Sequence, residues 1–217
     1  MKTRYYVFAA VFVLVALASS VVLYSSLPER VPMHWNAQGQ VNGYGSRLFA
    51  ALFVPAIMAA MTLLFAALPW LSPRKFEVNG RANGAVYLQV LLVVLGFLAA
   101  IHALILTAAT GRHLNMNMAI TGAVCGLFAV LGAFLPRLRR NFYVGIRTPW
   151  TLASEEVWHA THVFAAKWFI AGGIVGLLLT LIIRNFWAPL VVLMLAGGVP
   201  IVHSLVYYKR LEHRGQL

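Results

Sequence analysis

Six apolar runs, each close to the length of a membrane-spanning helix, dominate the sequence. A helix needs about 20 mostly apolar residues to cross the hydrocarbon core of a bilayer. Hydrophobic residues make up 61% of the 217 residues and charged residues only 10%, which excludes an ordinary soluble domain. The sequence therefore predicts an all-α membrane protein with six transmembrane helices. The runs are Tyr5–Ser26, Leu48–Leu68, Ala85–Thr110, Met116–Leu135, Phe164–Ile183 and Trp187–Tyr207.

The distribution of Lys and Arg predicts the orientation of these helices. The first run is longer than the roughly 7–15 residues of a signal-peptide core, so we expect a retained helix. With a cytoplasmic N-terminus, thirteen of the 17 Lys and Arg residues lie in inside segments, and the positive-inside rule then makes both termini cytoplasmic. The net charge of +12 follows mainly from this asymmetry. Because the charges adjoin membrane ends, we expect the lipid bilayer, and not nucleic acid, as their partner.

Acidic residues are scarce, and this restricts the chemistry available in the membrane. The sequence has no Asp, and none of its five Glu residues lies within an apolar run. An aspartyl intramembrane protease is therefore excluded, and ion-coupled transport is disfavoured. Cys125 is the single cysteine, so no intramolecular disulfide can form.

Histidines and glycines within the apolar runs predict contacts between helices. His102, His203 and His113 could form a proton or metal relay, but the shortage of acidic partners favours neutral imidazoles that are hydrogen-bonded to neighbouring helices. Two GxxxG spacings predict close packing of the fourth and fifth helices. They are formed by Gly122 with Gly126 and by Gly172 with Gly176.

A small extracytoplasmic hairpin is expected after the first helix, over Leu27–Arg47. Pro28 and Pro32 end the first helix and favour extended backbone. Asn36 to Gly39 has the composition of a turn, flanked by short strands at Val31–Trp35 and Gln40–Tyr44. The candidate functional residues of this hairpin are Pro32, His34, Trp35, Asn36, Gly39 and Gly43.

The longest connection, residues 136–163, is polar and aromatic and is the main candidate site. We refer to it as the long loop. It is expected to run as an extended stretch over Asn141–Arg147 with a kink at Gly145, then a turn at Thr148–Trp150. Thr151 or Ser154 would then cap a helix. Its candidate functional residues are Asn141, Gly145, Arg147, Thr148, Pro149, Trp150, Glu155, Glu156, Trp158 and His162.

The helical part of the long loop allows three interpretations. At about 100° per residue, Glu155, His159 and His162 share one narrow face, which could bind a metal such as zinc. Alternatively, Glu155 and Glu156 stabilise the helix N-terminus and pair with nearby arginines, with Arg147 and Glu156 as the expected pair. The third interpretation is a docking surface for a partner protein. Trp150 and Trp158 would form an aromatic platform at the lipid surface.

Two long motifs resemble those of a known family. Leu27–Arg47 follows the pattern LPxxVPxHWxxxGxxxGYGS, which resembles an outer-loop domain of unknown function in bacterial membrane proteins. Asn141–Lys167 contains NxxVGIRTPWTLxSEEVWxxTH and resembles the SdpI family signature. The chain differs from the family pattern at Asn42, where many relatives carry an acidic residue, and at His159. These segments suggest a division into residues 1–69, with the first two helices and the hairpin at 27–47, residues 70–135, and residues 136–217.

The resemblance implies a multi-pass protein of the bacterial cytoplasmic membrane that gives immunity against a secreted, membrane-active peptide toxin. It also implies signalling by capture of a winged-helix repressor at the membrane. The alternative is a membrane-embedded, metal-dependent hydrolase that uses Glu156 and His162 with His159 or Glu155. The sequence leaves both hypotheses open and favours the non-enzymatic one, since the Glu and His cluster does not follow the HExxH motif.

Overall fold

The computed structural model describes residues 2–71, 84–112, 114–183 and 185–217, and its secondary structure is almost entirely helical. Six long helices correspond to the six predicted runs, and each is long and apolar enough to cross a membrane. The protein is thus an all-α, multi-pass membrane protein, as predicted. The long helices are α1 (Lys2–Leu23), α2 (Arg47–Leu71), α3 (Gly84–Ala109), α4 (Met116–Phe134), α6 (Glu155–Ile182) and α7 (Trp187–His213).

Shorter elements connect these helices. A one-turn 3₁₀-helix at Tyr24–Ser26 and the strands β1 (Arg30–Trp35) and β2 (Val41–Ser46) separate α1 from α2. A second 3₁₀ turn, Leu135–Arg137, and a short helix α5 (Pro149–Ala153) separate α4 from α6. Four of the basic positions used to predict orientation, and one histidine, lie outside the described residues. They are Arg74, Lys75, Arg81, Arg184 and His113.

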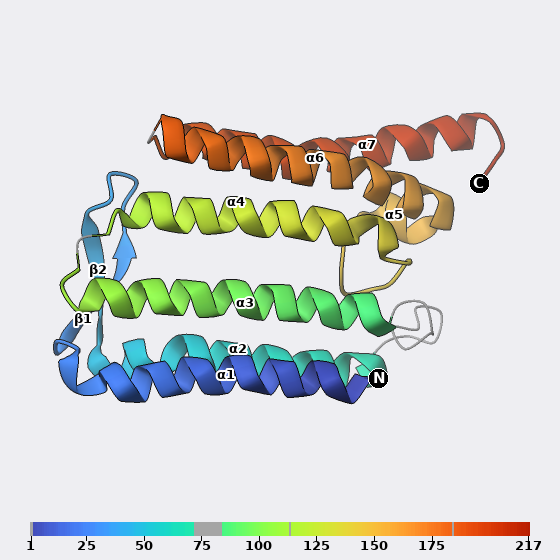
Figure 1. Ribbon diagram of the computed structural model, residues 1–217. Helices are drawn as coiled ribbons and strands as arrows, with labels where there is room; N and C mark the ends of the chain where they lie inside the picture. The colour runs from blue at the N-terminus through green and yellow to red at the C-terminus, as the bar shows by residue number, and fades with distance from the viewer. Residues whose placement is uncertain (1, 72–83, 113, 184) are drawn as a thin grey trace.

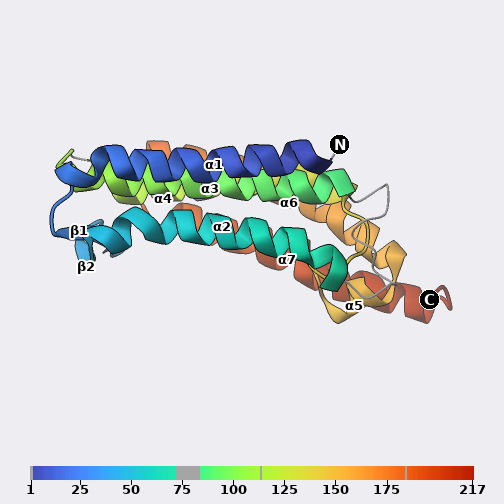
Figure 2. The same cartoon turned by 90° about the horizontal axis from the view of Figure 1, so that it is seen from below.

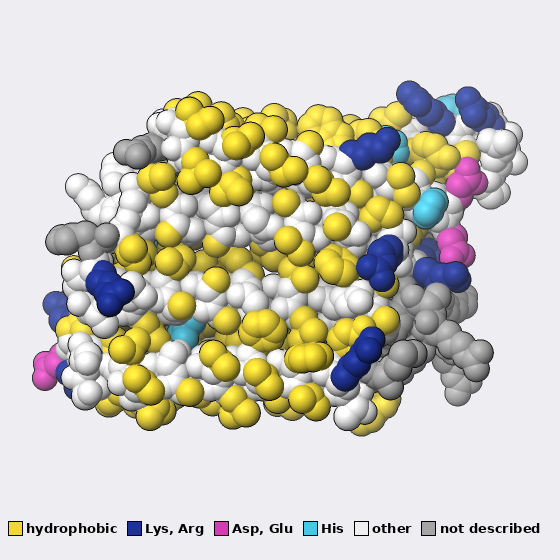
Figure 3. All heavy atoms as spheres, in the orientation of Figure 1, with side chains coloured by type: hydrophobic (Ala, Val, Ile, Leu, Met, Phe, Trp, Pro, Cys, Tyr) yellow, Lys and Arg dark blue, Asp and Glu magenta, His cyan; other side chains and the backbone are white. Residues whose placement is uncertain are grey.

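The long helices lie side by side with their ends roughly in register (Figure 1). The β-hairpin lies at one end of the bundle, and both chain termini and the long loop lie at the other end. The view from below shows the same separation (Figure 2). Hydrophobic side chains cover the visible middle of the bundle, and Lys and Arg side chains gather toward its two ends (Figure 3). Such a surface suits a bilayer, with apolar groups against lipid tails and cations near headgroups.

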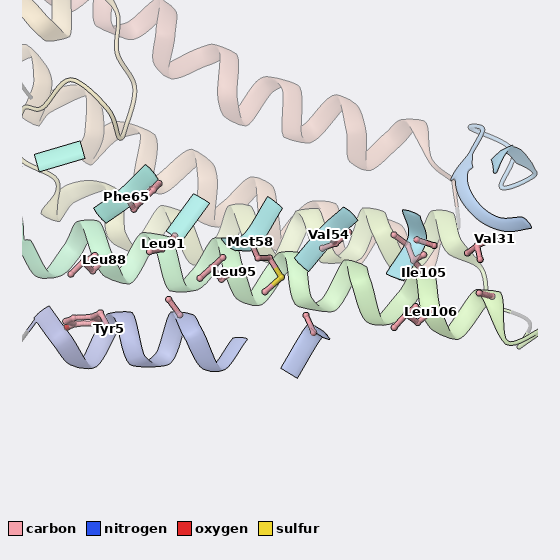
Figure 4. Close-up of a cluster of buried hydrophobic side chains, with 14 of the residues drawn as sticks. Tyr5, Val31, Val54, Met58, Phe65, Leu88, Leu91, Leu95, Ile105 and Leu106 are labelled. Carbon is pink, nitrogen blue, oxygen red and sulfur yellow. The ribbon is translucent and has the colours of Figure 1, made fainter. Parts of the chain in front are cut away.

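The helices α1, α2 and α3 enclose one apolar core, which we call the first core. Met58 of α2 and Leu91 and Leu95 of α3 are fully buried in it (Figure 4). A buried hydrogen-bond chain crosses the same three helices. The Ser20 hydroxyl donates to the Ala51 carbonyl oxygen (2.7 Å) and so accepts from Nε2 of His102 (2.8 Å). This confirms that His102 is hydrogen-bonded to a neighbouring helix.

The helix α6 packs against both α4 and α7, and small residues let the backbones approach closely. A Cβ atom added at Gly173 would lie 2.6 Å from the backbone nitrogen of Ala129 and from the carbonyl oxygen of Cys125. One added at Gly172 would lie 2.6 Å from the Ala196 Cβ in α7. The predicted close packing of the fourth and fifth helices is confirmed, although Gly173, outside the recognised GxxxG pairs, makes the closest backbone approach.

We therefore predict that Gly173→Ala destabilises the protein by about 1–3 kcal/mol, the usual cost of overpacking a close contact. The matched control is Gly197→Ala in α7, where an added Cβ meets nothing within 4 Å. That variant should be neutral or more stable by up to about 1 kcal/mol, because Ala favours a helix more than Gly. Thermal unfolding in detergent measures both. Equal effects of the two substitutions would contradict the importance of this contact.

Candidate functional site

The hairpin forms as predicted, with its strand boundaries shifted by one or two residues. β1 and β2 are antiparallel, and Asn36 organises the turn between them. Its side-chain oxygen accepts hydrogen bonds from the backbone N–H groups of Gln38 (3.0 Å) and Gln40 (2.9 Å). Gly39 has a φ of 80°, which favours glycine at this position. The turn is therefore fixed by local chemistry that can be read in the sequence.

The hairpin rests on the helices and does not project freely from them. Val31 is fully buried, and Trp35 is partly buried against the first core. At the tip, Nδ2 of Asn117 in α4 donates to the carbonyl oxygen of Ala37 (2.7 Å). Pro32 is partly buried within β1. The hairpin thus contacts helices from both halves of the chain.

The exposed face of the hairpin carries His34. Its Nδ1 lies 2.5 Å from Oδ1 of Asn42 on the opposite strand. Gly43 makes room for this histidine, since a Cβ there would lie 2.9 Å from the His34 Cβ. His34 is therefore held by an amide at the position where an acidic residue was expected from the family pattern.

Asn141 organises the first part of the long loop. Its Nδ2 donates to the carbonyl oxygens of Arg139 and Val144, both at 2.9 Å. Its Oδ1 accepts from the N–H groups of Tyr143 (2.9 Å) and Val144 (2.7 Å). The predicted extended stretch at Asn141–Arg147 is wrong, because these four bonds fold the backbone into a series of bends around one buried amide.

His162 anchors the second part of the loop from within α6. Its side chain is fully buried, and its Nε2 accepts a hydrogen bond from the Ile146 N–H (3.0 Å). Its Nδ1 lies 2.7 Å from the Trp158 carbonyl oxygen and donates to it. This pattern requires the neutral tautomer with the proton on Nδ1, because Nε2 must keep its lone pair.

Trp158 and Gly145 complete this arrangement. The Trp158 indole stacks on the His162 imidazole, with ring centroids 4.1 Å apart, and its Nε1 donates to the Leu138 carbonyl oxygen (2.7 Å). Gly145 has a φ of 115°, and a Cβ there would lie 2.5 Å from Nε2 of His162. Glycine is therefore required where the loop backbone crosses the imidazole. The predicted aromatic platform is wrong for Trp158, which is only 1% exposed, while Trp150 is partly exposed.

The segment predicted as a turn at Thr148–Trp150 is instead the start of helix α5. The Thr148 hydroxyl accepts from the Thr151 N–H (3.2 Å), and the Thr151 hydroxyl accepts from the Thr148 N–H (2.9 Å). Pro149 occupies the first helical position, where a missing N–H costs nothing. Ser154, one of the two predicted caps, then starts α6. The Thr-Pro pair was a readable signal for α5.

A contact with α7 also fixes this segment. The Ser204 hydroxyl donates to the Ile201 carbonyl oxygen (2.6 Å) and lies within hydrogen-bond distance of the Thr148 hydroxyl (3.0 Å). Ser204 and Thr148 are both buried. Ser204 was not identified from the sequence, because a lone serine in an apolar run carries no sign of its partner.

The expected Arg147–Glu156 ion pair is not formed. The Arg147 guanidinium donates to the Phe142 carbonyl oxygen (2.8 Å), and the Glu156 carboxylate accepts from the Tyr207 hydroxyl (3.1 Å). Arg140 donates to the carbonyl oxygens of Leu152 and Ala153 at the end of α5 (3.1 and 3.2 Å). Arg147 therefore binds a backbone oxygen within the bends of the long loop, and Arg140 binds the carbonyl groups that are left without helical partners at the end of α5.

The predicted metal-binding face is not assembled either. Glu155 and His159 are exposed, whereas His162 is buried with both ring nitrogens hydrogen-bonded. Among the described residues, no three His, Cys, Asp or Glu side chains are grouped so as to hold a metal ion. Glu155, His159 and His162 do not form one accessible face, because the loop covers His162.

Comparison with known proteins matches both parts of the chain. The profile of the SdpI/YfhL protein family matches residues 137–207, and that of a domain of unknown function, DUF1648, matches residues 11–59. The immunity protein SdpI of Bacillus subtilis (strain 168) is 30% identical over 105 residues, 47% of this chain and 50% of the relative. Taken together, these matches support membership of the SdpI family. It spans about half the length of this curated relative, and no solved structure matches it.

The two family matches cover the long loop and the hairpin. The SdpI/YfhL match begins at Arg137 and includes the loop, α5, α6 and most of α7. The DUF1648 match includes most of α1, the hairpin and the first half of α2. The DUF1648 match thus contains the hairpin at one end of the bundle, and the SdpI/YfhL match contains the long loop, from Arg137 onward, at the other end.

We predict that Gly145→Ala destabilises the long loop more than a positive φ alone can explain. The control is Gly111→Ala, which has a φ of 81° but no neighbour within 4 Å of the added Cβ. The free energy of unfolding of the control should fall by about 1–2 kcal/mol, because Ala is disfavoured in the left-handed backbone conformation. Gly145→Ala should lose about 1–3 kcal/mol more, because the added Cβ displaces His162. Unfolding measures the loss, and faster trypsin cleavage at exposed Arg147 reports local opening. Equal losses would contradict the anchoring role of His162.

Proposed function

We propose that this protein is an integral membrane immunity protein that protects its cell against a secreted, membrane-active peptide toxin. The similarity to the immunity protein SdpI of Bacillus subtilis carries this proposal. The two family matches support it, because they occur in one chain together with six candidate membrane spans. The relative is matched over half of its length, so immunity is proposed for this chain by similarity.

The proposed location is the bacterial cytoplasmic membrane, with the hairpin outside and the long loop inside. The excess of Lys and Arg in the segments at the loop end supports this orientation. Both termini share that end of the bundle (Figure 1). A toxin that arrives from outside would meet the hairpin first.

The long loop is the proposed contact for an intracellular partner, a winged-helix repressor that is captured at the membrane. The buried bonds of Asn141 and His162 hold the loop backbone in one conformation. Phe142, Arg147 and Glu155 are exposed on this rigid framework. A surface of this kind suits binding, because little conformational entropy is lost when a preorganised loop meets a partner. The described residues contain no group of three His, Cys, Asp or Glu side chains that would support the hydrolase alternative.

The orientation predicts opposite labelling of two introduced cysteines. Gln40→Cys lies on the exposed hairpin, and Glu155→Cys lies at the exposed start of α6. In intact cells, a membrane-impermeant maleimide should label Gln40→Cys, and it should label Glu155→Cys only after permeabilisation. The unmodified protein is the control, because its Cys125 is fully buried. Labelling of both positions from one side would refute the proposed topology.

Immunity itself is tested by expressing the protein in toxin-sensitive cells. His34→Ala and Trp35→Ala, on the hairpin, should reduce protection about tenfold each, the effect of losing roughly 1.4 kcal/mol of binding free energy. His159→Ala and Arg147→Ala, at the other end, should keep most of the protection, while Arg147→Ala should lose repressor recruitment. Immunoblots of membrane fractions control for abundance. Full protection in both hairpin variants would remove the hairpin from the mechanism.

A further inference from the structure

A polar cavity of about 410 Å³ lies beside the hairpin tip. It is bounded by the tip, the N-terminal turns of α4, the last turn of α6 and the start of α7. Its volume is within the range of about 300–1,000 Å³ that is typical of ligand sites. Amide and hydroxyl side chains dominate its lining: Gln38, Asn115, Asn117, Thr121, Thr180 and Asn185.

The cavity has a buried floor and an exposed rim. Thr121 and Thr180 are buried, and the Thr180 hydroxyl donates to the Gly176 carbonyl oxygen (2.8 Å). Gln38, Asn115 and Asn185 are exposed. The floor is thus built from two packed helices, and the rim from three separate segments of the chain.

Hydrogen bonds fix the amide side chains of the rim. Oδ1 of Asn115 accepts from the Met118 N–H (3.1 Å) at the start of α4. Oδ1 of Asn185 accepts from the N–H groups of Trp187 (2.7 Å) and Ala188 (3.3 Å) at the start of α7. These caps hold the amide groups in defined positions, because each oxygen is committed to backbone donors.

The same amides retain groups that a ligand can use. Within the described part of the chain, Nδ2 of Asn115 and of Asn185, Oδ1 of Asn117 and the Gln38 side-chain amide have no hydrogen-bond partner. The described lining therefore offers donors and acceptors together, and it contains no Lys, Arg, Asp or Glu side chain. Trp187 adds a large apolar surface at the rim, where it is 58% exposed.

We infer that this cavity binds an uncharged, extended peptide segment through its backbone amides. A peptide backbone presents alternating N–H donors and carbonyl acceptors, and the described lining offers both kinds of partner without a charge that would require neutralisation. The exposed Trp187 ring can contact an apolar side chain of the same segment. This inference deepens the proposed function. It rests on that function in one respect, namely that the peptide segment belongs to the toxin.

Direct binding to the whole protein in lipid nanodiscs tests the inference. The probe is an N-acetylated, C-amidated hexapeptide of alternating Thr and Val, with empty nanodiscs as the blank. We expect saturable binding to the unmodified protein. Asn185→Asp keeps the oxygen that caps α7 but removes the Nδ2 donor, and it should weaken binding by about five- to tenfold, the effect of one lost hydrogen bond. Unchanged thermal unfolding verifies that the variant is folded.

The matched control is Gln40→Glu on the hairpin. It adds the same negative charge at the same end of the bundle but does not line the cavity, and its remaining oxygen can still accept from Nδ2 of Asn36. Its affinity for the hexapeptide should stay within about twofold of the unmodified protein, since it loses no ligand contact. Equal weakening by Asn185→Asp and Gln40→Glu would overturn the inference, because charge alone would then explain the effect.

Other outcomes separate this inference from the proposed function. Absence of saturable hexapeptide binding overturns the peptide site. Saturable binding of maltohexaose or inorganic phosphate, if Asn185→Asp abolishes it, also overturns the peptide site, because the cavity would then bind a sugar or an anion. Hexapeptide binding with the expected variant pattern, but no protection of toxin-sensitive cells, supports the peptide site and contradicts the immunity proposal.

Discussion

Close backbone approach between helices is the constraint on which this structure depends. Lipid tails are as apolar as the side chains that face them, so the hydrophobic effect does little to hold membrane helices together. In this bundle Gly172 and Gly173 let α6 lie directly against α7 and α4. In the other half, the Ser20 hydroxyl links α1 to α2 and α3 through two buried hydrogen bonds. Close packing and buried polar contacts therefore hold these helices together, whereas in a soluble protein the exclusion of water from the core does so.

The two ends of the bundle tie its halves together in reciprocal fashion. The hairpin belongs to the first half of the chain, but its tip is bonded to Asn117 of α4. The long loop belongs to the second half, but Tyr143 and Val144 pack against the first core. Each half thus contributes a loop that rests on the other half. This arrangement suits a protein proposed to sense a molecule on one side of the membrane and a partner on the other.

The chemistry of the long loop favours rigidity over catalysis. His162 is the residue that an enzyme hypothesis would choose as a base or metal ligand. Its two ring nitrogens are already committed to the Ile146 N–H and the Trp158 carbonyl oxygen, and Trp158 covers one face of its ring. A base must be able to receive a proton, and Nε2 of His162 can do so only if it loses the hydrogen bond from the Ile146 N–H that holds the loop. The residues that remain exposed nearby include Arg147 and Glu155.

The sequence by itself determined the features that depend on local chemistry. Apolar runs of bilayer length predicted the six helices, and Asn36 and Gly39 predicted the hairpin turn. Ser154, one of two predicted caps, is the residue that starts α6. The Thr148–Pro149 pair carried the signal for α5 as well, although it was interpreted as a turn. These features need only the properties of neighbouring residues, since capping and turn formation act over three or four positions.

Only the tertiary structure decided which side chains meet across the chain. Asn117 reaches Ala37 from 80 residues away, and Thr148 meets Ser204 from a distance of 56 residues. The Arg147–Glu156 pair was predicted from charge alone and is absent. Exposed charges gain little free energy by pairing. Arg147 instead binds a backbone oxygen, and Glu156 binds the hydroxyl of Tyr207. His162 lies on the face predicted for metal binding, but the fold of the preceding loop places a backbone N–H on its free nitrogen. Periodicity gives the direction of a side chain, whereas its partner depends on how the rest of the chain folds around it.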